Sequence, residues 1–340
     1  MNKQTVFLRE IAEQPFALRR AIDYYRTEGR EPLARWHTLL QARKRVLFSG
    51  MGSSEYAVET ILPTLARRGL ESWLVDAGEL LHFPRPFDGL LVLISQSGES
   101  AETRQLAAQA SGRFVAVTNH PESAIARLAA LHLPMLAGDE AAISTKTYVN
   151  TLAVLHLMAR EAGKVDPALD RLERVSEAMN AVPPESIEKA ADVLAGAPAL
   201  QFIARGPAMA AAKEACLSFV EGTRLMTSAL TGGAFRHGPL ELADANHYCV
   251  MFIPQSPTAD LLNHLALELT AKGSHVVVIT DQPAGAVPAV AAVLSVPAHG
   301  EDLFCLEVAS VHARLLDAVA RRRGLTAGDF RYSGKITLTE

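Results

Sequence analysis

Cysteine is scarce in this chain of 340 residues, and the three that occur are far apart. Cys216, Cys249 and Cys305 each lie in an apolar run, which predicts buried, reduced thiols. An odd and widely spaced set of this kind does not form a disulfide framework. The cysteine content therefore favours a reducing compartment, and we expect the protein to be cytoplasmic.

A basic excess and long apolar runs are also missing. The formal net charge is −4 at pH 7, whereas nucleic-acid-binding proteins usually carry a positive excess. No apolar stretch reaches the roughly 18 residues of a membrane span, and the first residues lack the apolar centre of a signal peptide. We therefore expect neither a nucleic acid nor a membrane as a partner.

Signals for the common cofactors are incomplete. Gly50 and Gly52 match the start of a dinucleotide fingerprint, but the third glycine and the later acidic residue are absent. The chain also lacks the lysine and the spacing of a P-loop. His247 and His299 have no metal-ligand spacing, and no cluster of cysteine, histidine and aspartate occurs. The sequence thus predicts no metal and no cofactor.

Short apolar strands alternate with helices through most of the chain. The first 45 residues predict two helices, and a further helix is expected over residues 54–68. In the first half the predicted strands are residues 46–49, 73–75, 90–94, 114–117 and 131–136. In the second half they are residues 200–204, 248–253, 276–280 and 293–296. Strands that are apolar throughout and separated by helices indicate parallel sheets covered on both faces.

The pattern of strand, turn and helix begins twice, which indicates a duplicated domain. We therefore predict an α/β fold with two doubly wound parallel-sheet domains in tandem, preceded by helices and followed by an extended C-terminal tail. The predicted boundaries are 1–44 for the N-terminal helices, 45–165 for the first domain, 166–196 for a helical connector, 197–324 for the second domain and 325–340 for the tail.

Three polar loops of the first domain, residues 50–54, 95–100 and 143–147, occupy the position where open parallel sheets bind ligands, outside the carboxyl ends of the strands. Residues 95–100 read Ser-Gln-Ser-Gly-Glu-Ser and combine three hydroxyls, a glycine and a helix start. These are the components of an anion site, so the loop predicts a phosphorylated ligand. A plain serine N-cap is the alternative, and it explains one serine but not all three.

Several strings along the chain resemble one known family. They are residues 52–54, 95–100, 144–146, 213–215, 235–240 and 331–340. Individually they look like loops of the sugar isomerase (SIS) domain. In this order they are similar to the double-SIS isomerase module of glucosamine-6-phosphate synthase and its free-standing relatives. The resemblance runs from the end of the N-terminal helices to the last residue, and it implies two flavodoxin-like domains.

The resemblance implies a role for each matching residue. The phosphate-binding residues would be Ser54, Ser95, Gln96, Ser97 and Ser100, with Gly52, Ser53, Ser144 and Arg331 as further substrate-site candidates. Glu221 matches the glutamate that moves a proton between two carbons, and His237 matches the histidine that opens the sugar ring. Lys335, in the tail, matches the lysine that forms a Schiff base with the ketose. An aldose–ketose interconversion has a use for each of these groups.

Two positions depart from the family. The synthase has lysines one and three positions before the glutamate, where this chain has Val220 and Ser218. The charge around Glu221 therefore differs, and three functions stay open. The first is an aminosugar-phosphate deaminase/isomerase that acts on glucosamine 6-phosphate or a close analogue. The second is an isomerase or fructosamine-type deglycase for another sugar phosphate, and the third is a non-catalytic phosphosugar-binding regulator. The catalytic matches favour an enzyme.

The resemblance also implies a homodimer in which His237 reaches the neighbouring subunit's site. The synthase carries a glutaminase domain with a cysteine nucleophile, whereas this chain has no cysteine before Cys216. We therefore expect no glutaminase activity within this chain. The expected small-molecule partner is a sugar phosphate, whose gluco or galacto configuration the motifs do not encode.

Overall fold

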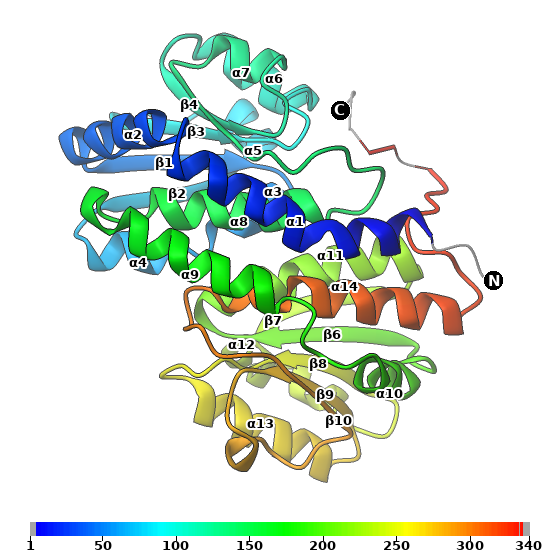
Figure 1. The fold of residues 1–340 in the computed structure, drawn as a ribbon. Coiled ribbons are helices and arrows are strands. Elements are labelled where there is room, and N and C mark those ends of the chain that lie inside the picture. Colours follow the sequence, from blue (N-terminus) through cyan, green and yellow to red (C-terminus); the bar gives the residue numbers. More distant parts are fainter. Residues whose placement is uncertain (1–4, 333, 336–340) are drawn as a thin grey trace. The chain divides into compact units, whose positions relative to one another are not determined.

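The computed structural model describes residues 5–332, 334 and 335 (Figure 1). It contains two five-stranded sheets flanked by helices. Every strand pair in both sheets is parallel. The predicted α/β fold with two tandem, doubly wound parallel sheets is thereby confirmed.

The elements of the first half begin with two helices and continue with the first sheet. The N-terminal helices are α1 (Val6–Arg26) and α2 (Arg30–Arg43). The strands are β1 (Arg45–Gly50), β2 (Glu71–Asp76), β3 (Leu90–Ile94), β4 (Phe114–Thr118) and β5 (Leu131–Pro134). The helices that connect and follow them are α3 (Ser53–Val58), α4 (Leu62–Arg67), α5 (Ala77–His82), α6 (Ala101–Gln109), α7 (Ala124–Leu128) and α8 (Lys146–Met158).

The second half begins with helical segments and continues with the second sheet. The helical segments are η1 (Ala162–Lys164), α9 (Val165–Ala178) and α10 (Pro184–Leu194). The strands are β6 (Ala199–Ala204), β7 (Met226–Thr231), β8 (Tyr248–Phe252), β9 (His275–Thr280) and β10 (Ala292–Ser295). The α-helices are α11 (Met209–Thr223), α12 (Gly232–Arg236), α13 (Ala259–Ala271) and α14 (Phe304–Arg322). Single 3-10 turns are η2 (Gly206–Ala208), η3 (Pro239–Leu242) and η4 (Ala284–Ala286).

Both sheets follow the same doubly wound order. The first runs β2-β1-β3-β4-β5, and the second, taken from its other edge, runs β7-β6-β8-β9-β10. In each sheet the direction of winding reverses beside the first strand. Ligands of open α/β sheets bind at this reversal, outside the carboxyl ends of the two central strands. In the first sheet these strands are β1 and β3, and the loops that follow them are residues 50–54 and 95–100.

Helices cover both faces of the first sheet. Helices α5, α6 and α7 pack side by side on one face, and α3 packs with α8 on the other. Inward-facing side chains of the strands, such as Leu47, Leu93 and Ala116, form a buried cluster with Leu106 of α6 and Ile125 of α7. Alternate residues of a strand point to opposite faces, so apolar residues at successive positions serve both faces.

Two segments differ from the sequence-based expectation. The helix expected over residues 54–68 is divided, because α3 ends at Val58 and α4 starts at Leu62 with a proline in its first turn. Strand β7 was not predicted, since it lies at a sheet edge and all of its side chains are at least partly exposed. An edge strand does not need the continuous apolar run of a central one.

The cysteines are free, and two of the three are buried as expected. Burial raises the pKa of the Cys249 thiol to about 12. Cys216 is only partly buried, and its sulfur lies 3.1 Å from the Thr227 hydroxyl. In the part of the chain that the structure describes, no helix is both long enough and apolar enough to cross a bilayer.

The chain forms two compact units, each built around one sheet. The first-sheet unit consists of Glu13–Glu140, Lys146–Ser176 and the described residues from Arg331 onward. The second-sheet unit consists of the described residues up to Ala12, together with Ala141–Thr145 and Glu177–Phe330. Each unit carries some of the residues that the sequence assigns to a site.

Candidate active site

The loop after β3 folds back on itself through its own serines. The Ser95 hydroxyl accepts a hydrogen bond from the Gly98 amide at 3.1 Å, and the Ser97 hydroxyl accepts one from the Glu99 amide, also at 3.1 Å. Both serines are buried. The Gln96 carbonyl accepts a further hydrogen bond at 3.1 Å from the backbone of the neighbouring β4 loop. The serine-rich run is therefore one compact turn that is tied to its surroundings.

Gly98 makes this turn feasible. Its φ of +66° lies in the left-handed region, which favours glycine. A Cβ at this position would lie 2.2 Å from the Ser123 hydroxyl oxygen, so a side chain would push the loop away from α7. The Glu99 carboxylate reinforces this contact, since it accepts a hydrogen bond from the Ala124 amide at 2.7 Å.

Ser100 occupies the N-cap position of α6 but does not cap the helix. Its side chain accepts no hydrogen bond from the helix amides, although serine is among the preferred capping residues. Its hydroxyl instead lies 3.5 Å from the Ser95 hydroxyl. Two hydroxyls and the first amides of a nine-residue helix thus share one end of the loop. The plain N-cap alternative does not describe Ser100, and the arrangement suits an anion.

The loop after β1 lies beside the loop after β3. A Cβ on Gly50 would come within 2.9 Å of the Ile94 carbonyl oxygen and within 3.2 Å of the Ser54 Cβ. Glycine is therefore needed where the ends of β1 and β3 converge. Gly52, with a φ of +54°, then turns the chain into α3, which begins with Ser53. The structure thus brings the two predicted phosphate-binding loops together at the reversal point of the first sheet.

Lys335 is held by the buried carboxylate of Glu140, which is not among the predicted site residues. Its ammonium donates to the Glu140 carboxylate at 2.5 Å, and the Glu140 side chain is fully buried. The same carboxylate accepts hydrogen bonds from the Thr147 amide at 3.1 Å and from the Thr147 hydroxyl at 2.6 Å. Burial would raise the pKa of Glu140, but the Lys335 ammonium and the two Thr147 donors outweigh it and hold that pKa below its usual value.

The predicted string at residues 144–146 divides between the units. Ser144 is partly buried and belongs to the second-sheet unit. Lys146 begins α8 in the first-sheet unit, and its side chain is buried. Its ammonium donates to the Glu13 carboxylate at 2.6 Å and to the Asp139 carbonyl at 2.5 Å. These contacts give Lys146 a structural role in anchoring the start of α8.

Glu221 lies in the last turn of α11, in the second-sheet unit, and is partly buried. The next residue, Gly222, lets α11 pack closely against α14, because a Cβ there would meet the Leu316 side chain at 2.6 Å. The helix ends at Arg224, which has a φ of +57° and donates its amide to the Val220 carbonyl. The carboxylate is thus carried by a helix end whose position is set by packing.

The two positions where the family has lysines differ in their surroundings. Ser218 is buried, and its hydroxyl donates to the Ala215 carbonyl at 3.3 Å. Val220 is 45% exposed. The helix turn before Glu221 therefore presents an apolar side chain to the surface and no cation at either position.

His237 lies at the exposed end of α12. The Thr231 hydroxyl caps this short helix by accepting a hydrogen bond from the Ala234 amide at 3.0 Å, and Phe235 anchors it in the core. The His237 side chain forms no hydrogen bond or ion pair with any other residue that the structure describes. Its imidazole is therefore exposed on the surface of this unit.

The predicted residues fall into two groups, one in each unit. The first-sheet unit carries Gly52, Ser53, Ser54, Ser95, Gln96, Ser97, Ser100, Arg331 and Lys335, and the second-sheet unit carries Ser144, Glu221 and His237. The first group offers hydroxyls and helix amides for an anion, together with an amine. The second group offers a carboxylate and an imidazole. Among residues 5–332, 334 and 335, no three or more histidines, cysteines and acids gather where they could hold a metal ion.

The SIS domain is the family whose sequence model matches this chain. The match covers residues 39–160 and 193–319, which carry the first and the second sheet. The chain is 30% identical over 301 residues to the isomerizing glutamine–fructose-6-phosphate aminotransferase of Zymomonas mobilis. This alignment covers 83% of the chain but 50% of that enzyme. The chain thus spans about half the length of the curated relatives it matches.

Solved structures with the same fold include two enzymes of amino-sugar chemistry. The C-terminal domain of glucosamine-fructose-6-phosphate aminotransferase from Francisella tularensis has a TM-score of 0.85 and 21% identity, with 96% of this chain and 98% of that chain covered. Glucosamine-6-phosphate deaminase from Thermotoga maritima has a TM-score of 0.74 and 20% identity, with 98% and 99% covered. At these identities the likeness concerns the fold. Together with the family match, it establishes that the chain belongs to the SIS domain family.

Proposed function

We propose that the protein is a phosphosugar isomerase and deaminase that converts an amino-sugar 6-phosphate, in the first place glucosamine 6-phosphate, to a ketose 6-phosphate and ammonia. The observation that carries the proposal is the loop 95–100. Its hydroxyls converge at the start of α6, and Ser100 leaves the capping position of that helix unused. A phosphate group fits this combination of hydroxyls and helix amides.

The remaining steps use the three predicted catalytic residues. His237 assists ring opening, because an imidazole exchanges protons near neutral pH. The Glu221 carboxylate removes the proton from C2 of the open-chain amino aldose and returns it at C1, which converts the aldehyde and amine into a hydroxymethyl group and an imine. The Lys335 ammonium passes a proton to the imine nitrogen, and the resulting neutral amine attacks the iminium carbon and displaces ammonia. Water hydrolyses the resulting Schiff base, so one amino-sugar phosphate and one water yield one ketose phosphate and one ammonia.

Glu140 supports this role of the tail. Its buried carboxylate holds Lys335 at 2.5 Å and is itself held by Thr147 at the start of α8. The lysine is therefore tied to the unit that contains the phosphate-binding loop. Arg331 lies four positions earlier in the tail, is exposed and forms no ion pair with other described residues, so it remains a candidate for contacting the substrate.

A second candidate function rests on Ser218 and Val220. The absence of cations at these positions removes the positive charge that the family places before the glutamate, and Val220 is 45% exposed. A site with less positive charge and more apolar surface also suits an amine adduct of a sugar phosphate. The alternative is therefore a fructosamine-type deglycase or an isomerase for another sugar phosphate. A phosphosugar-binding regulator would use the same phosphate loop without turnover.

We also propose a homodimer in which His237 serves the site of the neighbouring subunit. The imidazole is exposed and has no partner among the described residues, which supports a role outside its own unit. The family resemblance implies the same exchange.

The proposal is tested by supplying the purified protein with a panel of 6-phosphosugars. The panel contains glucosamine and galactosamine 6-phosphates, a fructosamine 6-phosphate, and glucose and fructose 6-phosphates as amine-free controls. We expect ammonia and ketose phosphate in equal amounts from an amino-sugar phosphate. Turnover of the fructosamine compound alone would support the deglycase, and tight binding without any turnover would support the regulator.

The role of Glu221 is tested by Glu221→Gln, with Glu185→Gln as a control at an exposed position of the same unit. Loss of the proton-transferring carboxylate should lower kcat by about 100-fold or more and leave sugar-phosphate binding intact. The control should retain full turnover. Equal turnover of Glu221→Gln and the unaltered protein would contradict the assignment.

A further inference from the structure

A cavity of about 300 Å³ lies on the first sheet, away from the loops at the ends of β1 and β3. It is lined by Arg45, Leu47, Trp73, Val75, Arg85, Pro86, Phe87 and Asp88. These residues come from β1, from β2 and from the chain between α5 and β3. All of them belong to the first-sheet unit. Its volume is at the lower end of the range for small-molecule sites.

The cavity exists because no helix covers this part of the sheet. Helix α5 ends at His82, and the irregular segment 83–89 crosses over the two strands instead. Phe87 is folded back toward Gly89, where a Cβ would lie 2.4 Å from the phenyl ring. Glycine at position 89 thus permits the ring to form a wall of the cavity.

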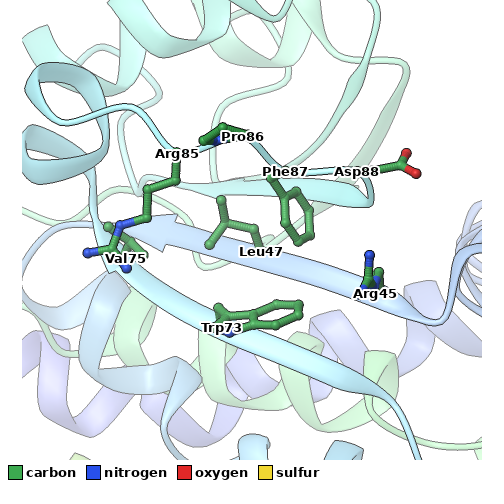
Figure 2. A pocket seen from close by; sticks show the side chains of 8 residues that line it. All are labelled: Arg45, Leu47, Trp73, Val75, Arg85, Pro86, Phe87 and Asp88. Atoms are coloured by element: carbon green, nitrogen blue, oxygen red, sulfur yellow. The ribbon is translucent and has the colours of Figure 1, made fainter.

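Aromatic surface dominates the cavity. Figure 2 shows the Trp73, Phe87 and Leu47 side chains grouped together at the cavity. The two rings are arranged edge to face, with centroids 5.6 Å apart. Trp73 remains 42% exposed, and its indole N–H donates no hydrogen bond to any residue that the structure describes. A large aromatic side chain left exposed beside an apolar wall is a preferred contact surface for ligands.

The charges around the cavity leave one cation unmatched. Arg45 is paired with Glu71 at 2.9 Å, and Asp88 lies 3.6 Å from Arg43. Arg85 forms no ion pair or hydrogen bond with other residues of the described chain. Its side chain descends beside Val75 at one end of the cavity, as Figure 2 shows. The cavity therefore combines flat apolar walls with one free guanidinium, the group that recognises carboxylate and phosphate best.

From this combination we propose that the cavity is a second binding site, and that its ligand is a small planar aromatic molecule with a carboxylate or phosphate group. The ring system packs on the apolar surface that Trp73, Leu47 and Phe87 form together, and the anionic group pairs with Arg85. The site is distinct from the phosphate-binding loops, because none of residues 50–54 and 95–100 lines it.

The site can be tested by tryptophan fluorescence, because the chain has only two tryptophans. Trp36 is fully buried and donates its indole N–H to the Met158 carbonyl at 2.9 Å, so a ligand in the cavity should affect Trp73 alone. The probes are 2-naphthoate and the neutral 2-naphthalenemethanol, each titrated into the full chain. We expect saturable quenching by 2-naphthoate and binding of the alcohol that is about tenfold weaker.

Variants separate the contributions of the ring and of the charge. Arg85→Gln should weaken 2-naphthoate about tenfold and leave the alcohol unchanged, whereas Arg43→Gln, outside the cavity, should alter neither. Trp73→Leu should abolish binding in calorimetry, with Trp36 emission and thermal unfolding reporting that the fold is intact. Equal affinities for the two probes, or insensitivity to Arg85→Gln, would overturn the proposal. If Trp73 emission changes with protein concentration in the absence of ligand, and the Trp73→Leu variant no longer forms an oligomer that the unaltered protein forms, the surface binds a second copy of the chain instead.

Discussion

At the scale of single residues, the phosphate-binding loop depends on a conformation that only glycine adopts cheaply. Gly98 has a φ of +66°, and a Cβ there would lie 2.2 Å from the Ser123 hydroxyl oxygen. Gly112 is a matched control, because its φ is +71° but a Cβ there would meet nothing within 4 Å. The two glycines therefore separate backbone strain from the clash with α7.

We predict that Gly112→Ala costs about 1 kcal/mol of unfolding free energy, the penalty of a left-handed alanine. Gly98→Ala should cost at least about 1 kcal/mol more, because the loop must also move away from Ser123. Chemical denaturation measures both. Calorimetry should show weaker binding of glucosamine 6-phosphate to Gly98→Ala, by about tenfold or more, and unchanged binding to Gly112→Ala. Equal binding to both variants would mean that the loop does not hold the phosphate.

The buried pair of Lys335 and Glu140 makes a second prediction. The pKa of Glu140 is lowered in the folded protein, so the pair stabilises the fold above the unfolded pKa of the carboxyl, and this contribution is lost as the pH falls through the folded pKa. In Lys335→Ala the burial of Glu140 is no longer opposed by the ammonium. We expect the variant to lose about 3 kcal/mol of unfolding free energy at pH 7.5, and we expect this loss to shrink as the pH falls through the folded pKa of Glu140, below which the carboxyl is protonated in both proteins.

The double variant Lys335→Ala with Glu140→Gln is the control for this pair. It replaces the buried carboxylate that has lost Lys335 by a neutral amide that can still bond to Thr147, and it should regain most of the stability at pH 7.5. Urea denaturation at a series of pH values decreasing from 7.5 distinguishes the cases. A loss of stability in Lys335→Ala that stays constant over the whole series would show that the ion pair is not its cause.

Residue patterns located the loop after β3 but not the contacts that hold the candidate site together. The serines and Gly98 were recognisable because they follow a strand within six positions. Glu140 was not, because its partner Lys335 is 195 positions away and nothing local marks a carboxylate that will be buried. The unused cap at Ser100 was equally hidden, since local sequence cannot tell a capping serine from one that turns toward Ser95. The assigned roles of Glu221, His237 and Lys335 stay predictions.

At the scale of elements, every strand except the edge strand β7 was predictable from the sequence. Strand β3 occupies the predicted residues because it is apolar throughout and buried between neighbours on both sides. The sequence did not predict strand β7, because this edge strand has one partner strand and all of its side chains are at least partly exposed. Its apolar pattern is therefore weak. The break between α3 and α4 does have a local signal, because Pro63 cannot donate a hydrogen bond within a helix and instead lies in the first turn of α4.

Helix α14 contains a buried histidine that links its packing to pH. Burial lowers the pKa of His312 to about 4, and its ring packs edge to face on Phe252 of β8, with centroids 6.5 Å apart. The unfolded chain binds a proton near pH 6.5, while the folded protein does so only near pH 4. Stability therefore falls as the pH decreases from 6.5 to 4, by about 3 kcal/mol for this residue.

We predict that His312→Gln removes this dependence. At pH 7.5 the unfolding free energy of the variant should differ from that of the unaltered protein only by the packing cost of the substitution. As the pH approaches 4, the unaltered protein should lose about 3 kcal/mol more than the variant, so this difference should shrink or change sign. Denaturant unfolding at several pH values measures it. A difference that stays constant over this range would show that His312 is not neutral in the folded protein.

At the scale of the whole molecule, the two sheets share an architecture but differ in the loops that follow their central strands. Both sheets share the doubly wound order, so each has a reversal point where a ligand could lie. In the first sheet, glycines and serines follow the two central strands. In the second, β6 is followed by Arg205 and Gly206 and β8 by Pro254, without a serine–glycine turn. Fold symmetry was predictable from the repeated pattern, but which half holds the phosphate depends on the loops alone.

The proposed exchange of His237 between subunits can be decided by mixing two inactive variants. In a dimer of Lys335→Ala with His237→Asn, one site has neither an intact lysine nor an intact neighbouring histidine. The other site has its own Lys335 and receives His237 from the Lys335→Ala subunit, so it is complete. Random reassociation yields heterodimers in half of the population, each with one working site out of two, and should restore about a quarter of full turnover. Separately, each variant should show almost no turnover.

If His237 served its own subunit, every site in the heterodimer would lack one group, and the mixture would stay as inactive as its components. Mixing His237→Asn with Glu221→Gln should behave like the first mixture, because Glu221 is expected to act within its own subunit. A result that differs between the two mixtures would therefore contradict the expectation that Glu221 acts within its own subunit.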